Sequence, residues 1–320
     1  MYCFILFKTM QLTHFTIKNY SMKQLLYIAA IALFTSCSNR ITPSTTPIVN
    51  TEVLNNQNQP ILLGHCSLDA LQQKTYVDWY NKNYTSYQFD SSVILQLQTK
   101  MNNYTIEIFL GTWCGDSKRE VPRMMKVLQA AQIDTGNIRL IFVSNNSNAY
   151  KQSPQQEQLN KFIHRVPTFI VYKNNKEVNR IVELPVETLE KDLLQIVNQQ
   201  PYSSNYKAAK QWYSFNQKNK ILSDTTLKLW ANKHKHLCKN AAELNALGYV
   251  LLAEKKFTQA LNVFTVNSFI YPQNANVYDS LAEAYELIGN KVKAIENYKK
   301  VLAITPNNEA VKNKINQLQQ

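Results

Sequence analysis

The side chain in this sequence best placed to act as a nucleophile is Cys114, which lies between an apolar run and a polar run. The stretch 104–110 is strand-like, and the stretch 118–128 is helix-like. A cysteine at such a junction lies beside the first N–H groups of a helix, which lack intrahelical partners and carry the positive end of the dipole. That setting favours the thiolate, the form that attacks disulfides. Cys114 is therefore the candidate nucleophile, although a single cysteine is also commonly a small buried apolar residue.

Three further features favour the chemical interpretation. Trp113 directly precedes the cysteine, Pro122 falls inside the following helical stretch, and Pro167 begins a distant apolar strand. Together they resemble the thioredoxin superfamily, whose W-C-x-x-C motif precedes a helix with a proline five residues after the second cysteine. The family's cis-proline faces the active cysteine. The resemblance extends from about residue 64 to residue 199 and implies an α/β thioredoxin-like fold, a central mixed sheet flanked by helices.

The motif departs from the family pattern at three positions. Ser117 stands where the resolving cysteine would be, and Asp116 replaces the usual proline. Ile108 occupies the position of a buried acid found in many members, although Glu107 is adjacent. A serine can donate a hydrogen bond to the thiolate but cannot open a mixed disulfide, so release must come from a small thiol or from the substrate's own second cysteine.

These considerations assign catalytic roles to Cys114 and Ser117. The resemblance implies substrate-binding roles for Trp113, Gly115, Asp116, Val166 and Pro167. It also implies a cis Val166–Pro167 bond, with Pro167 against Cys114 and the Val166 backbone free to pair with an extended substrate. Nearby charges act in both directions, because Lys118 and Arg119 favour a thiolate at position 114 and Asp116 disfavours it.

Composition narrows the functional class. The chain has 320 residues and a net charge of +13, but its lysines are dispersed and do not interleave with aromatic residues as in nucleic-acid binding proteins. Six glycines are too few for a glycine-rich phosphate loop. Five cysteines form neither a disulfide framework nor a zinc-ligand spacing. We therefore expect no metal, no cofactor and no nucleic acid.

Two other cysteines allow alternative interpretations. Cys66 is expected to be a buried cysteine at the start of a helix spanning 67–84, and the alternative is a hidden resolving thiol. Cys238 follows His234 and His236, but this spacing would spread metal ligands around a helix, so surface residues are expected.

The N-terminal region resembles a bacterial lipoprotein signal peptide. Residues 22–37 have a basic start, an apolar core and small residues before Cys37, with 33–37 as a loose lipobox. The apolar core is short for a bilayer span, and an uncleaved anchor is the alternative. Residues 1–21, which include Cys3, are interpreted as the product of a start codon assigned too early. Lipid attachment at Cys37 would place the protein in the bacterial envelope, outside the cytoplasm and most simply facing the periplasm.

The rest of the chain divides into four segments after the leader, 1–36. They are a disordered tether (37–60), the thioredoxin-like domain (61–200), connecting helices (201–240) and helical repeats (241–320). Inside the domain we expect helices at 67–84, 90–99, 118–128 and 186–197, strands at 104–110 and 137–144, and a hairpin over 168–183. The polar stretch 145–161 is either a long loop or a weakly specified helix.

The C-terminal segment contains an internal repeat. Leu247-Gly248, Ala260, Phe264 and Pro272 recur thirty-four positions later as Leu281-Ala282, Ala294, Tyr298 and Pro306. This pattern resembles tetratricopeptide repeats, in which small residues let paired helices approach and prolines end the second helix.

Two functions follow from these features. The first is an envelope-anchored enzyme of thiol–disulfide exchange that uses Cys114 alone, in isomerisation, mixed-disulfide formation or substrate capture. Its partners would be protein or peptide thiols and disulfides, and the membrane through lipidated Cys37. The second is a non-catalytic scaffold whose repeats bind a protein partner.

The leader generates a prediction about the mature protein. Intact protein isolated from bacterial cells should lack residues 1–36 and carry lipid on Cys37, because the pattern before Cys37 is that of a processed lipoprotein. Mass spectrometry of the intact chain measures both. A full-length, unmodified mass would contradict the lipoprotein interpretation.

Overall fold

The computed structural model describes residues 50–218 and 220–320. The leader, the signal peptide, Cys37 and the first part of the predicted tether lie outside the described residues. Across those two described ranges, no helix combines the length and the apolar character needed to cross a bilayer.

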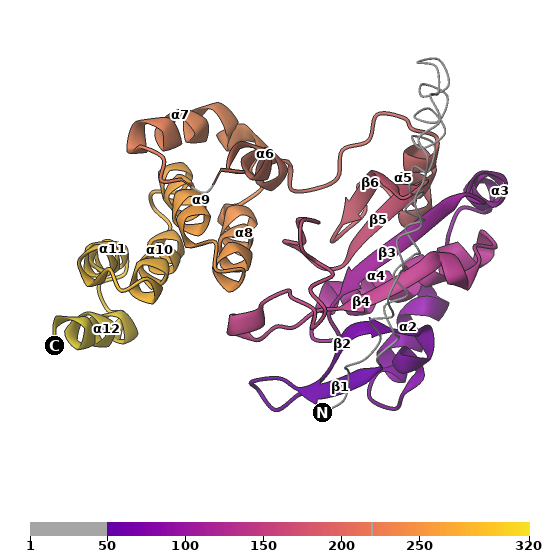
Figure 1. Cartoon of the computed structure of the whole chain (residues 1–320), viewed down its shortest axis with the longest axis horizontal. Coiled ribbons are helices and arrows are strands. Elements are labelled where there is room, and N and C mark those ends of the chain that lie inside the picture. The colour runs from indigo at the N-terminus through magenta and orange to yellow at the C-terminus, as the bar shows by residue number, and fades with distance from the viewer. Residues whose placement is uncertain (1–49, 219) are drawn as a thin grey trace, which may run out of the picture. The chain divides into compact units, whose positions relative to one another are not determined.

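Six strands form one mixed sheet (Figure 1). They are β1 (Thr51–Leu54), β2 (Pro60–Cys66), β3 (Tyr104–Leu110), β4 (Ile138–Phe142), β5 (Thr168–Lys173) and β6 (Lys176–Val182), in the order β1-β2-β4-β3-β5-β6. β3 and β4 are parallel, and all other neighbours are antiparallel. The predicted strands and hairpin are confirmed, and Asn174 and Asn175 form the hairpin turn with positive φ angles of 52° and 60°.

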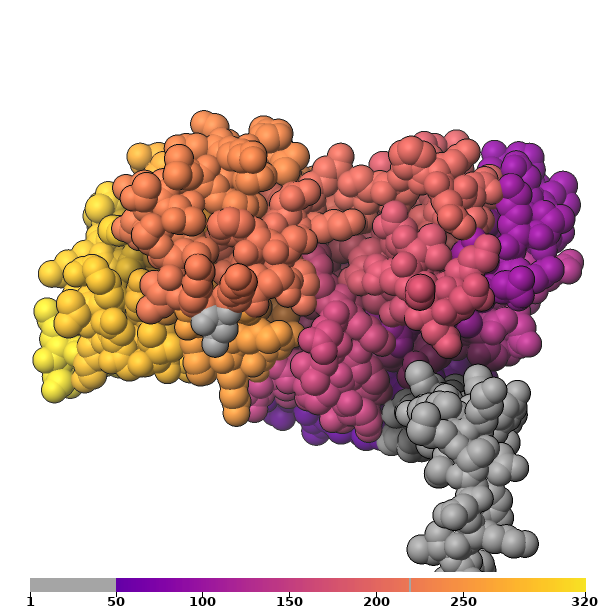
Figure 2. Space-filling view, turned by 45° about the horizontal axis from the view of Figure 1, so that its top comes forward, coloured from indigo at the N-terminus to yellow at the C-terminus, as the bar shows by residue number. Residues whose placement is uncertain are grey.

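The central strand β3 is buried on both faces. Ile106 and Ile108 point into a core shared with α2 (Val77–Ser86), α3 (Ser91–Lys100), α4 (Gly115–Ala130) and α5 (Leu189–Val197). Phe109 points to the opposite face, where it packs with Val143 and Val166. α3 contacts α5, and Figure 2 shows these two segments side by side on the surface. The predicted fold, a mixed sheet flanked by helices, is confirmed.

The N-terminal edge of the sheet corrects one expectation. Residues 51–60 were expected to be disordered, but β1 pairs antiparallel with β2. The turn between them is held by Asn55, whose side chain accepts hydrogen bonds from the N–H groups of Gln57 and Gln59, both at 2.9 Å. An edge strand of four residues is too short to show a clear apolar alternation, so the sequence did not reveal it. Cys66 consequently ends β2 and does not begin a helix.

Other differences are local. The helix expected over 67–84 is divided into a 3₁₀ turn, Leu68–Gln72, and α2. Ser67 does not cap it, because its hydroxyl accepts instead from the side chain of Asn50 at 3.1 Å. α5 begins at Leu189, where the hydroxyl of Thr188 accepts from the Lys191 N–H. The stretch 145–161 is a loop with one 3₁₀ turn, Ser147–Ala149, so the loop alternative is correct.

The C-terminal region is entirely helical in its regular structure, as expected. It contains α6 (Lys207–Phe215), α7 (Asp224–His234), a 3₁₀ turn (Lys235–Leu237), α8 (Ala241–Ala253), α9 (Phe257–Ile270), α10 (Ala275–Leu287), α11 (Lys291–Ile304) and α12 (Glu309–Gln319). α8 packs on α9 and α10 packs on α11, as the repeat pattern requires. The repeat's small residues lie at these contacts, since Ala260, Ala282 and Ala294 have no exposed surface.

Gly248 of α8 provides a test of this packing. A Cβ at this position would lie 2.3 Å from the Phe264 ring of α9. Gly248→Ala should therefore lower the free energy of unfolding by about 1–3 kcal/mol, even though alanine favours helices by ~1 kcal/mol, because the overlap with a buried ring is the larger effect. Denaturant unfolding measures the change.

Two variants control this prediction. Gly136→Ala should be nearly neutral, because its Cβ would meet Asp134 at an ordinary 3.4 Å. Adding Phe264→Leu should make Gly248→Ala less costly than it is alone, since the ring is then absent. Equal effects of Gly248→Ala in both backgrounds would contradict the close α8–α9 approach.

Candidate functional site

Cys114 lies where the sequence placed it, between β3 and α4. It is the N-cap residue of α4, and its carbonyl accepts from the Lys118 N–H at 3.0 Å. Its own N–H donates to the Gly111 carbonyl at 3.0 Å. The side chain is partly exposed and packs against the cluster of Phe109 and Val166. The thiol is therefore accessible at the start of a 16-residue helix.

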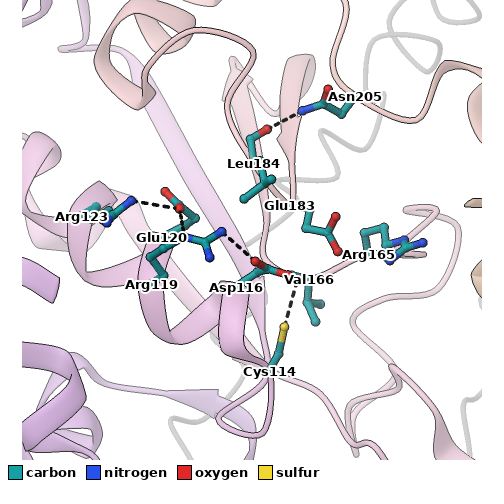
Figure 3. A network of polar contacts seen from close by, with 10 residues as sticks. All are labelled: Cys114, Asp116, Arg119, Glu120, Arg123, Arg165, Val166, Glu183, Leu184 and Asn205. Atoms are coloured by element: carbon teal, nitrogen blue, oxygen red, sulfur yellow. Dashed lines mark hydrogen bonds and ion pairs between the residues drawn. The ribbon is translucent and has the colours of Figure 1, made fainter. Parts of the chain in front are cut away.

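The segment before β5 provides the partner of this thiol. The Val166–Pro167 bond is cis, as predicted. The Cys114 S–H donates to the Val166 carbonyl with an Sγ–O distance of 3.2 Å (Figure 3). Residues 52 positions apart thus meet at one point. A direct Pro167–Cys114 contact stays a prediction, but the residue bonded to Pro167 holds the sulfur.

Ser117 has a different partner from the one expected. Its hydroxyl is 1 % exposed and accepts from the Gly111 N–H at 3.3 Å. Position 111 requires glycine, because a Cβ would lie 2.5 Å from the Trp113 ring. The indole N–H of Trp113 donates to the Val143 carbonyl at 2.8 Å, which fixes the ring beside Cys114. Ser117 therefore holds the loop that carries Cys114 in place. Because the Ser117 hydroxyl acts as an acceptor here, its proton can still donate a hydrogen bond.

Asp116, the acidic residue of the motif, forms an ion pair. Asp116 lies 2.7 Å from Arg119, which also contacts the buried carboxylate of Glu120 (Figure 3). Hydrogen bonds to these acids, Glu120 foremost, raise the pKa of Arg119. Gly115 is exposed, and a Cβ there would meet nothing within 4 Å, so no packing constraint demands a glycine. The Asp116 charge near the thiol is thus partly offset by Arg119.

The sequence missed Lys151, which lies in the loop after β4. Its side chain is 4 % exposed, and its Nζ donates to the His164 carbonyl and to the Tyr150 hydroxyl, each at 2.8 Å. Burial, and then the charge of Arg165, lower the pKa of Lys151 to about 7, whereas a Cys114 thiolate raises it. No periodicity or motif in this polar stretch indicates a buried lysine.

A second ion pair flanks the same segment. Arg165 lies 3.2 Å from Glu183 and also donates to the Ala242 carbonyl at 2.7 Å. Burial raises the pKa of Glu183, and Arg165 opposes that shift. The Glu183 N–H donates to the Pro167 carbonyl at 2.7 Å. Figure 3 shows Asp116, Arg165 and Glu183 gathered around the contact between Cys114 and Val166.

Ile108 and Glu107, neighbours on β3, point to opposite faces of the sheet. Ile108 faces the helix-side core. Glu107 is 3 % exposed and contacts Lys161, Arg139 at 3.3 Å and the Tyr172 hydroxyl at 3.1 Å. Because Lys161 and Arg139 both pair with this carboxylate, Glu107 is engaged in structural ion pairs.

The two other cysteines of the described ranges, Cys66 and Cys238, pack in clusters other than that of Cys114. Cys66 packs in the core on the helix side of the sheet, whereas Cys114 packs on the other side, which argues against a resolving role for Cys66. Burial raises the pKa of Cys66 to about 11 and that of Cys238 to about 12. Both therefore remain protonated thiols at neutral pH.

Comparison with known protein families matches residues 68–194 to the family described as Thioredoxin. No curated protein matches the chain. The matched region contains Cys114, α4 and the Val166–Pro167 bond. Residues 68–194 are thus a thioredoxin-like domain, which the helical C-terminal region follows, and such a domain supports a general thiol–disulfide oxidoreductase type of function.

Proposed function

We propose that this chain carries out thiol–disulfide exchange through one nucleophile, Cys114, while anchored in the bacterial envelope by lipid on Cys37. The observation that carries the proposal is the partly exposed Cys114 thiol at the start of α4, 3.2 Å from the Val166 carbonyl and next to a cis-proline. A helix N-terminus stabilises the negative charge of a thiolate. The signal-peptide pattern of residues 22–37 supports the anchoring.

The proposed first step is attack on a substrate disulfide. The Cys114 thiolate displaces one sulfur of the substrate, so a new S–S bond forms as the old one breaks. The departing sulfur leaves as a thiolate and takes a proton from solvent. When Cys114 loses its proton, the Val166 carbonyl loses the hydrogen bond that it accepts from the S–H group. That carbonyl then becomes available to a backbone N–H of an extended substrate.

The second step needs an outside thiol. Ser117 stands one helical turn beyond Cys114 but has no sulfur, so it cannot attack the mixed disulfide. Release falls to a small thiol or to a second cysteine of the substrate, which attacks the Cys114–substrate bond and restores the Cys114 thiolate. This chemistry suits isomerisation, exchange with small thiols or substrate capture better than net reduction.

A labelled disulfide peptide tests the first step. Wild-type protein should form a covalent adduct at Cys114 that is reversed by added thiol, and Cys114→Ala should form none. Ser117→Cys should trap less adduct and turn over disulfides faster in the presence of a dithiol, because side chains three apart at a helix start lie on one face.

The matched control is Ser117→Ala, which removes the hydroxyl without adding a thiol. It should keep the adduct and gain no turnover. Absence of any adduct from neutral to mildly alkaline pH, with Ser117→Cys equally inactive, would rule out exchange chemistry at this site.

A second candidate function is capture of a protein partner by the helical region. A cavity of about 560 Å³ has an apolar wall of Leu252, Phe257 and Leu287, and Tyr150, which contacts Trp113, also lines it. Leu287 is 60 % exposed at this wall. The chemistry fits an apolar segment of a polypeptide, held close to the thiol.

Substitution at the cavity separates the two candidates. Leu287→Arg should abolish partner capture by introducing a charge into the apolar wall, whereas Leu95→Arg, at an equally exposed leucine of α3, should not. Capture that survives Cys114→Ala supports the scaffold. Capture lost only with Cys114 would show that the thiol alone holds the partner.

A further inference from the structure

Two unfavourable features coincide at Lys151. Its side chain is 4 % exposed, and its backbone φ of 56° lies in the left-handed region. Burying an ammonium group costs several kcal/mol before any pairing, and a left-handed conformation costs a non-glycine residue further energy. Such costs are concentrated where a charge is used, and after Arg165 the charge that acts most on Lys151 is that of the proposed nucleophile.

The amine is held in one place. Its Nζ donates to the His164 carbonyl and the Tyr150 hydroxyl, and it lies 4.2 Å from the centre of the Tyr150 ring. The backbone of Lys151 donates to the Ser144 carbonyl at 2.8 Å, and Ser144 donates to the Gln152 carbonyl at 2.9 Å. The loop therefore fixes the lysine directly after β4.

The same short segment holds both Lys151 and Cys114. Lys151 binds the carbonyl of His164, and Cys114 binds the carbonyl of Val166, two residues later. A charge on Cys114 raises the pKa of Lys151 and that of Tyr150. The buried ammonium and the thiol are thus held by two carbonyls of one short segment, 164–166.

We propose that Lys151 is the cationic partner of the Cys114 thiolate, a positioning residue whose ammonium stabilises the nucleophile. The inference rests on the proposed function only in taking Cys114 as that nucleophile. The ammonium favours the ionised sulfur before attack and again when the mixed disulfide is released. It also presents a positive charge to incoming anionic groups.

The charges facing Lys151 set the sign of the pH dependence. Burial and Arg165 lower the pKa of Lys151 to about 7, and Cys114 and Glu183 raise it. Burial raises the pKa of Tyr150 from 10.0 and holds that of His164 well below 6.5, so both stay neutral around pH 7. The positive charge at the thiol should therefore fall as pH rises through about 7, while Arg165 stays charged.

Two alkylating reagents measure this charge directly. Iodoacetate is anionic and iodoacetamide is neutral, and both need the thiolate, so the ratio of their rates at Cys114 cancels the amount of thiolate. In the full chain this ratio should fall about fivefold between about pH 6 and about pH 9. Peptide mapping by mass spectrometry reads Cys114 separately from the buried Cys66 and the half-buried Cys238.

Variants assign the change to Lys151. Lys151→Met should give a low ratio at every pH, and Lys151→Arg should keep the ratio high up to about pH 9. Lys74→Met, which removes a charge from an exposed lysine, should match wild type. Glu183→Gln should move the fall to lower pH, because the carboxylate supports the ammonium form of Lys151.

Each outcome decides the inference. A wild-type ratio that does not change with pH, or a folded Lys151→Met variant that matches wild type, overturns it. If Lys151→Met fails to fold, the pH dependence of the ratio in the wild type and in Lys151→Arg still tests the inference. If Cys114 forms a disulfide adduct but the ratio of alkylation rates does not change with pH, only the role of Lys151 is refuted. If the ratio changes with pH but no adduct forms, only disulfide exchange is refuted.

Discussion

The antiparallel pairing of β3 with β5 is the constraint on which the site depends. Phe109, near the end of β3, pairs with Thr168 at the start of β5. Residues that follow β3 must therefore lie beside residues that precede β5. That register brings Cys114 to the Val166 carbonyl across 52 positions of sequence. A shift of the pairing would separate the sulfur from the cis-proline segment.

Burial on both faces of β3 secures this register. Ile106 and Ile108 belong to the core under the helices, while Phe109 belongs to the cluster that also holds Val166 and the Cys114 side chain. A slip of one residue would exchange these two sets of side chains between the faces. It would also remove Glu107 from Lys161 and Arg139 and leave a buried carboxylate without its cations.

Charges around the thiol are arranged in pairs. Asp116 is held by Arg119, and Glu183 is held by Arg165, so each acid near Cys114 has a neighbouring guanidinium. Lys151 differs, because its hydrogen-bond partners are a carbonyl and a hydroxyl, and within residues 50–218 and 220–320 no carboxylate forms an ion pair with its amine. Lys151 is thus a cation beside the Cys114 segment whose hydrogen bonds go to neutral groups.

The sequence by itself determined those parts of the protein that local rules control. Strand β3, the helix containing Pro122 and the Asn174-Asn175 turn follow from apolar patterning and turn chemistry, as does the paired helical packing around Gly248. The position of Cys114 at a strand-to-helix junction follows from the same rules. The domain boundaries at 200 and 240 and the role of each site residue stay predictions.

Only the tertiary structure decided which polar residues are buried. β1 is a four-residue edge strand, recognisable through its pairing with β2 and not through its own short sequence. Ser117 binds Gly111 because the loop before α4 folds back onto it. Lys151 is buried because its own loop, 144–152, is held together by backbone hydrogen bonds and packs against segment 164–166. A lysine in a polar stretch carries no local sign of burial, since burial depends on contacts made by residues distant in sequence.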